Sequence, residues 1–254
     1  MIKVEKMKIE KQTEIAKNIY ELKLKGTLVN EISMPGQFVH IKVNTANDPL
    51  LRRPISISSY DKEQQTMTLI YRASGLGTRE LTNQTDEIDV MGPLGSGFPV
   101  DGAEGKTAIL IGGGIGVPPL YECSKQLKNK GFKVIHVLGF ESKETVFYES
   151  AFKALGSVYI TTADGSYGTN GFVTDAIRAF NLQADVFYAC GPVPMLGAVE
   201  KQLDDIPGFI SMEQRMGCGI GACLACVCTV NGPELYKKVC TDGPVFRKGE
   251  LVYG

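Results

Sequence analysis

Cysteines are the residues of this 254-residue chain whose spacing points most directly to chemistry. Five of the seven lie between Cys218 and Cys240. The first three of these, Cys218, Cys223 and Cys226, have four and then two residues between neighbours, the ligand spacing of plant-type [2Fe-2S] sites. Such sites use a fourth, more distant cysteine, and Cys240 in a turn-rich segment is the expected one. The pattern predicts a cluster that carries electrons.

Two other interpretations of the cysteines stay open. Cys228 lies nearer to the first three than Cys240 does, so it could compete for the fourth position. A zinc ribbon would need two pairs of cysteines with two residues between partners, and only Cys223 and Cys226 form such a pair. Glycines on both sides of Cys218 favour the cluster, because they let a loop wrap closely and direct backbone N–H groups at its sulfurs.

Two glycine-containing segments suggest a dinucleotide site. Residues 112–118 follow an apolar run and precede a helical pattern, a context in which backbone N–H groups hold pyrophosphate. Val117 occupies the place of the third Rossmann glycine, so the segment alone is also typical of a tight strand-to-helix turn. Residues 189–195 likewise follow a strand pattern, and two such strand ends meet at one crevice in an open α/β sheet. Taken alone, Cys190 there is a small buried hydrophobe.

A third motif lies in residues 51–58, where Arg53, Pro54 and Ser56 combine a phosphate-binding guanidinium, a fixed backbone angle and a strand hydroxyl. By itself this could be an ordinary edge strand. Residues 70–72 and a glycine turn at 74–78 follow it.

The elements that would position these motifs fall into three segments, expected as domains 1–101, 102–210 and 211–254. The first holds short β-like runs at 38–43 and 67–71 between turns, which predicts a barrel or sandwich. The second alternates strand and helix patterns, which predicts a doubly wound parallel sheet. Its expected strands are 107–111, 133–138, 157–162 and 185–189, and its expected helices are 120–129, 173–180 and 194–203. The third is too short to bury a core without a metal.

Charge and hydropathy exclude several classes of partner. Lys and Arg number 27 against 28 Asp and Glu, so we expect no nucleic acid and no anionic membrane surface as a partner. The N-terminus lacks a signal-like apolar region and no run approaches the ~20 apolar residues of a membrane span, so we expect a soluble, cytoplasmic protein. His40 and His136 lie in strand-like runs and are expected to be structural.

The barrel motif and the 70–78 segment together resemble the FAD site of the ferredoxin reductase superfamily, over the first ~210 residues. The resemblance implies an N-terminal antiparallel FAD barrel in an α+β multidomain chain, with Ser56 beside the flavin N5 and Cys190 beside the nicotinamide as catalytic residues. The third Rossmann glycine is normally missing in that family. For FAD it implies contacts from Arg53, Pro54, Ile55, Ser56, Ile70, Tyr71, Arg72, Gly75, Gly77 and Thr78. For NAD the expected contacts are Gly113, Gly114, Gly116, Pro118, Asp164, Gly191, Pro192 and Met195.

The whole chain, including 211–218 and 239–246, is similar to the electron-transfer subunits of NAD-linked (class 1B) dihydroorotate dehydrogenase. The resemblance implies that cysteines 218, 223, 226 and 240 hold a cluster between FAD and the FMN of a separate TIM-barrel subunit, which oxidises dihydroorotate to orotate in pyrimidine biosynthesis. It implies a heterotetramer of two copies of each subunit, in which electrons reach NAD through FAD. These 254 residues leave no room for an added barrel of ~250 residues.

Two details follow with alternatives left open. Asp164 without an arginine indicates NAD rather than NADP, although Lys143 nearby leaves the strictness open. The face around 218–226 is expected to meet the partner, because an electron must leave from the cluster. One alternative is a subunit that passes electrons to a ferredoxin, a sulfur compound or a hydrogenase. Another is a non-catalytic redox or zinc-binding regulator on a reductase scaffold.

Overall fold

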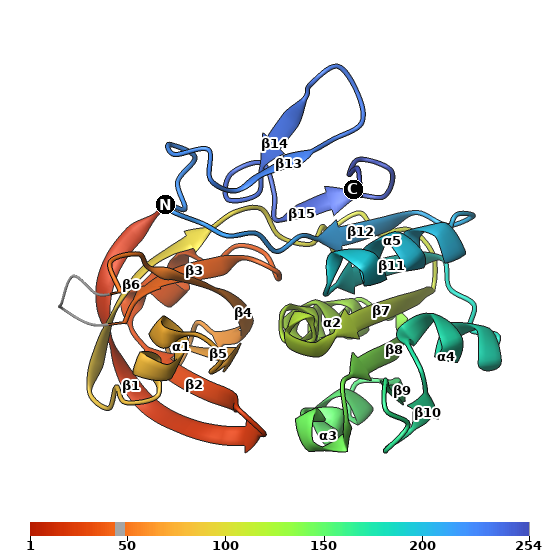
Figure 1. The fold of residues 1–254 in the computed structure, drawn as a ribbon, viewed down its shortest axis with the longest axis horizontal. Helices are drawn as coiled ribbons and strands as arrows, with labels where there is room; N and C mark the ends of the chain where they lie inside the picture. The colour runs from red at the N-terminus through yellow and green to blue at the C-terminus, as the bar shows by residue number, and fades with distance from the viewer. Residues whose placement is uncertain (44–48, 254) are drawn as a thin grey trace.

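A computed structural model describes residues 1–43 and 49–253. In this part of the chain, six antiparallel strands close a barrel in the order β1-β2-β5-β4-β3-β6 (Figure 1). Their bounds are β1 (Lys3–Ala16), β2 (Ile19–Lys25), β3 (Phe38–Lys42), β4 (Arg53–Asp61), β5 (Thr66–Arg72) and β6 (Glu87–Leu94), with η1 (Thr27–Glu31) and α1 (Leu76–Leu81) between them. Alternate strand residues such as Leu22, Val39 and Ile41 fill the interior. The predicted antiparallel barrel is confirmed.

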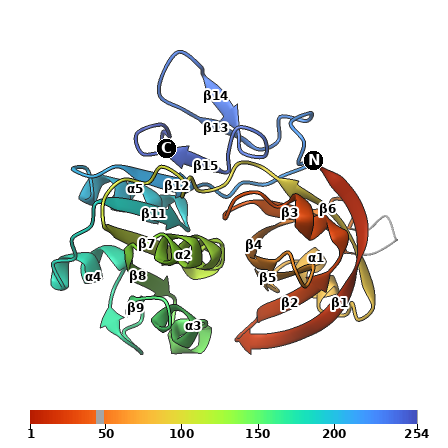
Figure 2. The ribbon, with the colours of Figure 1, turned by 180° about the vertical axis from the view of Figure 1, so that it is seen from behind.

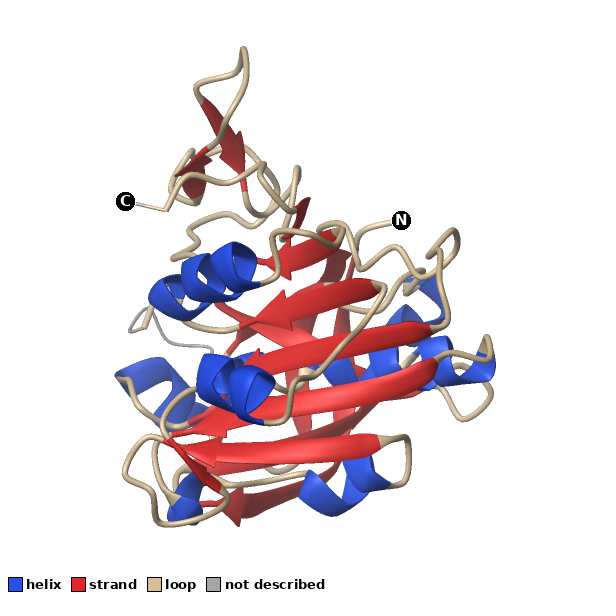
Figure 3. Ribbon diagram, turned by 90° about the vertical axis from the view of Figure 1, so that its right-hand side faces the viewer, coloured by secondary structure: helices blue, strands red, loops and turns tan. Residues whose placement is uncertain are grey.

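A mixed sheet forms the second half of the molecule (Figure 3). In the described residues its order is β10-β9-β8-β7-β11-β12-β15, parallel except for β15. The strands are β7 (Thr107–Gly113), β8 (Lys133–Phe140), β9 (Ser157–Thr162), β10 (Thr169–Asn170), β11 (Val186–Cys190), β12 (Gly208–Ser211) and β15 (Val245–Arg247). The helices are η2 (Gly114–Gly116), α2 (Pro119–Asn129), η3 (Lys143–Thr145), α3 (Glu149–Lys153), α4 (Val173–Ala179) and α5 (Val193–Gln202).

Helices cover both faces of this sheet, which confirms the doubly wound prediction. Ile109 and Ile111 of β7 pack in one core with α4 and α5, whereas Ala108 and Leu110 pack in the other core with α2 and α3. Neighbouring residues of a strand point to opposite faces, so an unbroken apolar run serves both cores. Among the described residues, no helix is long and apolar enough to cross a membrane.

Several expected element ends were wrong by one or two residues. Strand β8 continues to Phe140 instead of ending at residue 138, and β11 starts and ends one residue later than expected. Helix α2 starts at Pro119, because proline suits a first turn where the missing N–H has no intrahelical partner. The helix expected at 173–180 ends at Ala179, and the helix expected at 194–203 runs one residue earlier, from Val193 to Gln202.

The C-terminal segment lies over the junction of barrel and sheet. Strands β13 (Val227–Thr229) and β14 (Tyr236–Lys238) form a hairpin that rises above the other two parts (Figure 2). Strand β15 then pairs antiparallel with β12 and adds an edge to the sheet. One apolar core contains Phe38 from the barrel, Val199 from the sheet half, and Cys226 and Cys240 from this segment. The cysteines are therefore packed against both larger parts.

Candidate redox site

A cleft of about 1010 Å³ separates the barrel from the sheet. Its walls come from β4, β5, the turn before α1, the loop after β7 and the segment that follows β12. The residues include all the expected FAD contacts except Gly77: Arg53, Pro54, Ile55, Ser56, Ile70, Tyr71, Arg72, Gly75 and Thr78. Residues 51–56 and 70–78 are thus brought together by antiparallel pairing of β4 with β5. A cleft of this volume suits a large ligand such as a dinucleotide.

Arg53 and the following turn form one end of this arrangement. A Cβ atom on Gly77 would lie 2.2 Å from Nε of Arg53, so a larger residue at 77 would displace the guanidinium from this position. The hydroxyl of Thr78 accepts the N–H groups of Ser74 and Gly75 at 3.2 and 3.1 Å, which holds the turn closed. A fixed guanidinium beside an ordered turn is the chemistry expected of a pyrophosphate site.

Tyr71 presents less surface to the cleft than the sequence suggested. Its ring is buried and stacks on Tyr20 with centroids 5.7 Å apart, and its hydroxyl donates to Gln12 Oε1 at 3.0 Å. The Gln12 amide donates in turn to carbonyls at the end of α1, the nearest at 3.0 Å from Thr82. Through Gln12, Tyr71 therefore also links β5 to β1 and to the end of α1.

The two glycine segments of the sheet meet where β7 and β11 end side by side. A Cβ on Gly116 would lie 2.4 Å from the carbonyl oxygen of Cys190, and one on Gly113 would lie 2.5 Å from Sδ of Met195. Burial raises the pKa of the Cys190 thiol well above its usual value, so the thiol is neutral at physiological pH. Glycine is required at 116, where the neighbouring atoms are backbone, whereas a side chain at 113 would have to displace Met195. The two loops are therefore in close contact.

The same loop also reaches the flavin side. Gly114 has φ +54°, and a Cβ there would lie 3.3 Å from Nη2 of Arg72. Pro118 caps the start of α2, while Gly191 and Pro192 open the turn into α5. The expected nicotinamide contacts at the ends of β7 and β11 are thus close to the expected flavin contacts at the end of β5.

Asp164 lies apart from these residues, after the end of β9. Its Oδ1 accepts the Ser166 hydroxyl at 2.6 Å and the Ser166 N–H at 3.0 Å, and these bonds hold its pKa below the usual value. The backbone N–H of Lys143 donates to the same Ser166 hydroxyl at 2.8 Å. Strands β9, β8 and β7 are adjacent and parallel, so this carboxylate lies on the same sheet edge as the glycine loop.

Glu213 is a cleft residue that the sequence reasoning missed. The residue is exposed to the space of the cleft, but protein atoms surround it there, and this partial burial raises the pKa of its carboxyl group, while the Arg72 guanidinium acts in the opposite direction. The Glu213 charge also raises the pKa of the Cys190 thiol. Its position just after β12, which pairs with β11, was the only available signal.

The cysteine loop is folded around its own thiol sulfurs. The Cys218 Sγ accepts the N–H of Ala222 at 3.2 Å, the Cys223 Sγ accepts the N–H of Cys218 at 3.3 Å, and the Cys240 Sγ accepts the N–H of Gly221 at 3.2 Å. Burial alone would raise the pKa of Cys218, but the surrounding N–H groups and Cys223 lower it to about 7. Donors aimed at sulfur stabilise thiolates, the form that binds iron.

Two further cysteines complete the picture. Burial raises the pKa of Cys240 to about 11, and the neighbouring Cys226 thiol adds to the effect. Cys228 is buried in β13 instead, with Sγ 3.6 Å from the Lys237 carbonyl across the hairpin. Within residues 1–43 and 49–253, no three metal-binding side chains converge as they would around one ion. A [2Fe-2S] cluster divides its four thiolates between two irons, so its ligand set is more extended than that of a single ion.

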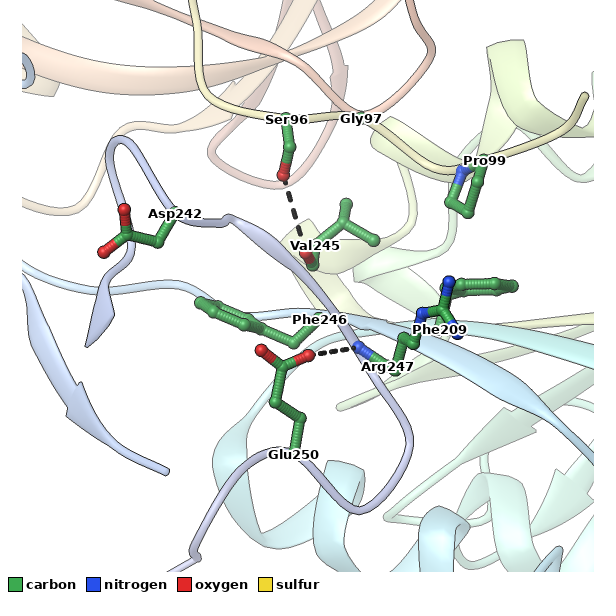
Figure 4. Close-up of a pocket in the computed structure, with 9 residues that line it drawn as sticks. All are labelled: Ser96, Gly97, Pro99, Phe209, Asp242, Val245, Phe246, Arg247 and Glu250. Carbon is green, nitrogen blue, oxygen red and sulfur yellow. Dashed lines mark hydrogen bonds between the residues drawn. The ribbon is translucent and has the colours of Figure 1, made fainter. Parts of the chain in front are cut away.

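A smaller cavity of about 240 Å³ lies where the barrel meets β12 and β15 (Figure 4). Ser96 Oγ donates to the Val245 carbonyl at 3.5 Å, and Glu250 accepts the Arg247 N–H at 3.0 Å (Figure 4). Its other lining residues are Gly97, Pro99, Phe209, Asp242 and Phe246. These two bonds join lining residues, and Asp242 instead accepts the Lys238 N–H at 2.7 Å, so the polar groups serve local structure, which fits a joint between parts of the chain.

Known proteins resemble this chain both in its C-terminal segment and over nearly its whole length. The family of the iron-sulfur cluster binding domain of dihydroorotate dehydrogenase B matches residues 213–252, which confirms the predicted C-terminal cluster domain. The electron transfer subunit of dihydroorotate dehydrogenase B (NAD(+)) from Geobacillus sp. (strain WCH70) is 56% identical over 256 residues, covering 99% of this chain and 100% of that protein. Its counterpart from Bacillus cereus (strain G9842) is 55% identical over 258 residues, with the same coverage.

Solved structures extend the likeness to three dimensions. A chain of NADH-dependent reduced ferredoxin-NADP oxidoreductase superposes with a TM-score of 0.86 at 29% identity, covering 97% of this chain and 90% of that one. The cytochrome P450 reductase from Amycolatopsis has a TM-score of 0.68 at 22% identity, covering 80% and 66%, and shows a shared fold.

Proposed function

The chain belongs to the family of electron transfer subunits of NAD-linked dihydroorotate dehydrogenase B, and from this premise we propose that it carries electrons from dihydroorotate oxidation to NAD. It is an oxidoreductase subunit that uses FAD and a [2Fe-2S] cluster, with NAD as co-substrate. The observation that carries this most strongly is the full-length identity with the family, joined to a cysteine loop packed against the flavin cleft.

The overall reaction sets what the protein must arrange. Dihydroorotate loses two electrons and two protons to become orotate, while NAD gains two electrons and one proton as a hydride at C4, and one proton goes to solvent. When bound, FAD exchanges electron pairs with the nicotinamide and single electrons with the cluster. The chain itself has to hold these groups close and exclude water, which the cleft and the segments that line it support.

For the flavin side, we propose that Arg53 and the Gly77–Thr78 turn hold the pyrophosphate and that Ser56 faces the flavin N5. Ser56 lies on the cleft wall of β4, directly opposite Phe38 of β3. Pro54, Ile55, Ile70, Tyr71, Arg72 and Gly75 would complete the FAD contacts. A divided chain with an FAD barrel at 1–101, an NAD part at 102–210 and a cluster part at 211–254 fits this arrangement.

For the nicotinamide side, we propose that the neutral Cys190 thiol lies beside the ring and that Gly113, Gly114, Gly116 and Pro118 form the pyrophosphate loop. Gly191, Pro192 and Met195 would shape the same crevice, because they contact that loop. Asp164 would accept the ribose hydroxyls and repel the phosphate of NADP. Its low pKa keeps the carboxylate charged, which supports this choice.

We propose cysteines 218, 223, 226 and 240 as the cluster ligands, and an FMN-containing TIM-barrel catalytic subunit as the partner, with two copies of each in a cytoplasmic heterotetramer. The family name already implies a catalytic partner subunit. Apolar side chains of the C-terminal segment are exposed: Ile220 and Leu224 in the cysteine loop at 50 and 49%, and Leu235 in the turn between β13 and β14 at 83%. Exposed apolar side chains on the segment that carries the expected cluster ligands would suit docking of that partner.

The first test is a visible spectrum of the anaerobically purified chain with iron, sulfide and flavin assays, followed by titration with NADH. We expect a flavin band with added iron–sulfur absorbance, bleached by NADH. Replacing Cys226 with Ser should spare NADH reduction of a dye through FAD but abolish electron transfer to the partner. Zinc without a chromophore would contradict the redox function, and loss of both activities in the serine variant would make the cluster mainly structural.

A second candidate function is supported by one observation. The superposed chain of NADH-dependent reduced ferredoxin-NADP oxidoreductase is 29% identical over nearly all of this chain, so a ferredoxin-linked role is the main rival. Ferredoxin reduction by the purified chain with NADPH, without a catalytic subunit, would support that role. Strict dependence on NADH and on the partner would support the first.

A further inference from the structure

His40 is buried in an unusual place, on the outer face of the barrel. Its neighbours in β3, Val39 and Ile41, point into the barrel core, whereas Phe38 packs into the core shared with the C-terminal segment. His40 is two residues from Phe38, so it points to the same outer side. The side chain is nevertheless completely buried, which places it beneath the C-terminal segment that covers this face.

The cysteine loop lies directly against the imidazole ring. A Cβ atom on Gly219 would be 2.7 Å from Nδ1 of His40 and 3.3 Å from the Leu94 side chain, and Gly219 has φ +73°. Only glycine is compatible with both the contact and the backbone angle. Gly219, the residue next to the first expected ligand Cys218, is thus packed directly against the His40 ring.

The ring itself is poorly satisfied. Among residues 1–43 and 49–253, neither Nδ1 nor Nε2 of His40 has a hydrogen-bond partner. The Cys218 backbone faces the ring without completing a bond, and Phe38 meets it edge-on with centroids 6.5 Å apart. A buried polar group without partners is costly, so a residue needed only to fill space would better be apolar.

His40 is also bonded to the region of β4, the strand expected to contact the flavin and called the flavin strand below. In the β3–β4 pair it lies opposite Pro54, which stands between Arg53 and Ser56. Its carbonyl accepts a hydrogen bond from Arg52 Nη1 at 3.3 Å. The backbone of His40 is therefore held by the flavin strand and the adjacent Arg52. The His40 side chain packs against the cysteine loop.

We propose that His40 is a positioning residue that sets the cysteine loop relative to the flavin strand, by donating an imidazole N–H to the Cys218 backbone when the cluster is bound. This inference rests on the proposed function. In this role, the His40 side chain sets the distance and orientation between the FAD site and the cluster, although it belongs to neither site. Hydrogen-bonding partners one step removed from metal ligands orient those ligands and tune the metal.

The test compares His40→Leu and His40→Asn in the full chain carrying FAD and cluster. The asparagine amide can replace Nδ1 as a donor, whereas leucine keeps only the bulk. For the leucine variant we expect normal flavin content and normal flavin reduction by NADH. Reduction of the cluster through FAD should be slower by about tenfold or more, with a changed electron paramagnetic resonance spectrum and a shifted midpoint potential. Asparagine should restore most of each property.

His136→Asn is the matched control, because His136 is equally buried in the sheet half but has partners for both nitrogens. It should leave the cluster spectrum and potential unchanged. A leucine variant identical to the parent in rate, spectrum and potential would overturn the proposal. Loss of the cluster from the leucine and asparagine variants alike, with FAD retained, would also overturn it and leave the ring a space-filling role.

The two proposals fail separately. A parent chain without flavin or iron would defeat the proposed function whatever His40 does. A parent chain with both cofactors and an unaffected leucine variant would defeat only the role of His40. If the leucine variant does not fold, Gly219→Ala supplies the second probe, since its methyl group presses on Nδ1 while the imidazole stays. Unchanged cluster spectrum and potential in that variant would count against the proposal.

Discussion

His136 shows how a buried histidine can be fully satisfied and still make stability depend on pH. Its Nε2 lies 2.7 Å from the Ser124 hydroxyl and its Nδ1 lies 3.0 Å from the Ser157 carbonyl oxygen. Burial lowers its pKa to about 4, and the Ser157 carbonyl acts in the opposite direction. The unfolded chain, with a histidine pKa near 6.5, therefore binds more protons than the folded chain between these two values.

The sign of this linkage gives a prediction. The contribution of neutral His136 is complete above about pH 6.5 and is lost as pH falls toward 4, by about 2 kcal/mol between pH 7 and pH 5. His136→Gln should be less stable than the parent at pH 7 but should lose less stability at pH 5. Urea unfolding of both proteins at the two pH values measures this. Equal losses in the two proteins would show that other groups govern the acid response.

Single residues also mark where sequence reasoning succeeds and fails. The four-and-two spacing of the cysteines is local, so the loop and its N–H donors could be expected from the sequence. The position of Glu213 in the site could not be predicted from the sequence. It depends on the pairing of β12 with β11, which brings this carboxylate near Cys190. His40 looked structural for the same reason, since nothing local reveals what covers its strand.

At the scale of elements, strands were predictable where one rule controlled them. The central parallel strand β7 is buried on both faces and reads as a continuous apolar run, so its start at Thr107 was predicted correctly. The less buried β9 was also placed correctly, at 157–162. Closure of the barrel was not readable, because alternation identifies a strand face but not its neighbours. The antiparallel β15 was missed as part of the sheet, since a three-residue strand after a cysteine loop carries no periodic signal.

The contact between the β7 and β11 ends predicts the effect of one methyl group. In Gly116→Ala the new Cβ would lie 2.4 Å from the Cys190 carbonyl oxygen, which is backbone and has little room to move. The glycine loop should shift, and NADH reduction of the flavin should slow by about tenfold or more, since misplacement of about 1 Å can cost a hundredfold. Stopped-flow reduction with NADH measures the rate.

Gly197→Ala is the control for that variant, because Gly197 lies within α5 of the same half and the nearest atoms to its Cβ would be side-chain atoms of Tyr253 at 3.4 Å, an ordinary contact distance. Alanine also suits a helix interior better than glycine. Its NADH reduction rate should match the parent, and FAD and iron contents should be unchanged in both variants. A normal rate in Gly116→Ala would mean that nicotinamide does not bind at this junction.

At the scale of the whole molecule, the three parts of the chain meet around the cleft and the cysteine loop. The barrel and sheet face each other across the cleft, and the cysteine loop closes over their junction, with β15 returning into the sheet (Figures 1 and 2). The core around Phe38 and Cys240 belongs to no part alone. Removing the C-terminal segment would therefore expose apolar surface on both halves, so the parts are coupled in stability as well as in electron transfer.

Ile220 in the cysteine loop and Leu235 in the turn between β13 and β14 are exposed apolar side chains, and we expect a docked catalytic subunit to contact this segment so that its own redox site lies near the cluster. In the double variant Ile220→Glu and Leu235→Glu, carboxylates would be buried at the interface without partners, so the dissociation constant should rise about tenfold or more. NADH reduction of a dye should stay normal, because the cleft proposed to hold FAD is untouched. Phe172→Glu, equally exposed beside α4, should bind like the parent. Binding measured by calorimetry distinguishes the two surfaces: weakening by Phe172→Glu alone would move the docking face from the cysteine loop to the nucleotide half of the molecule.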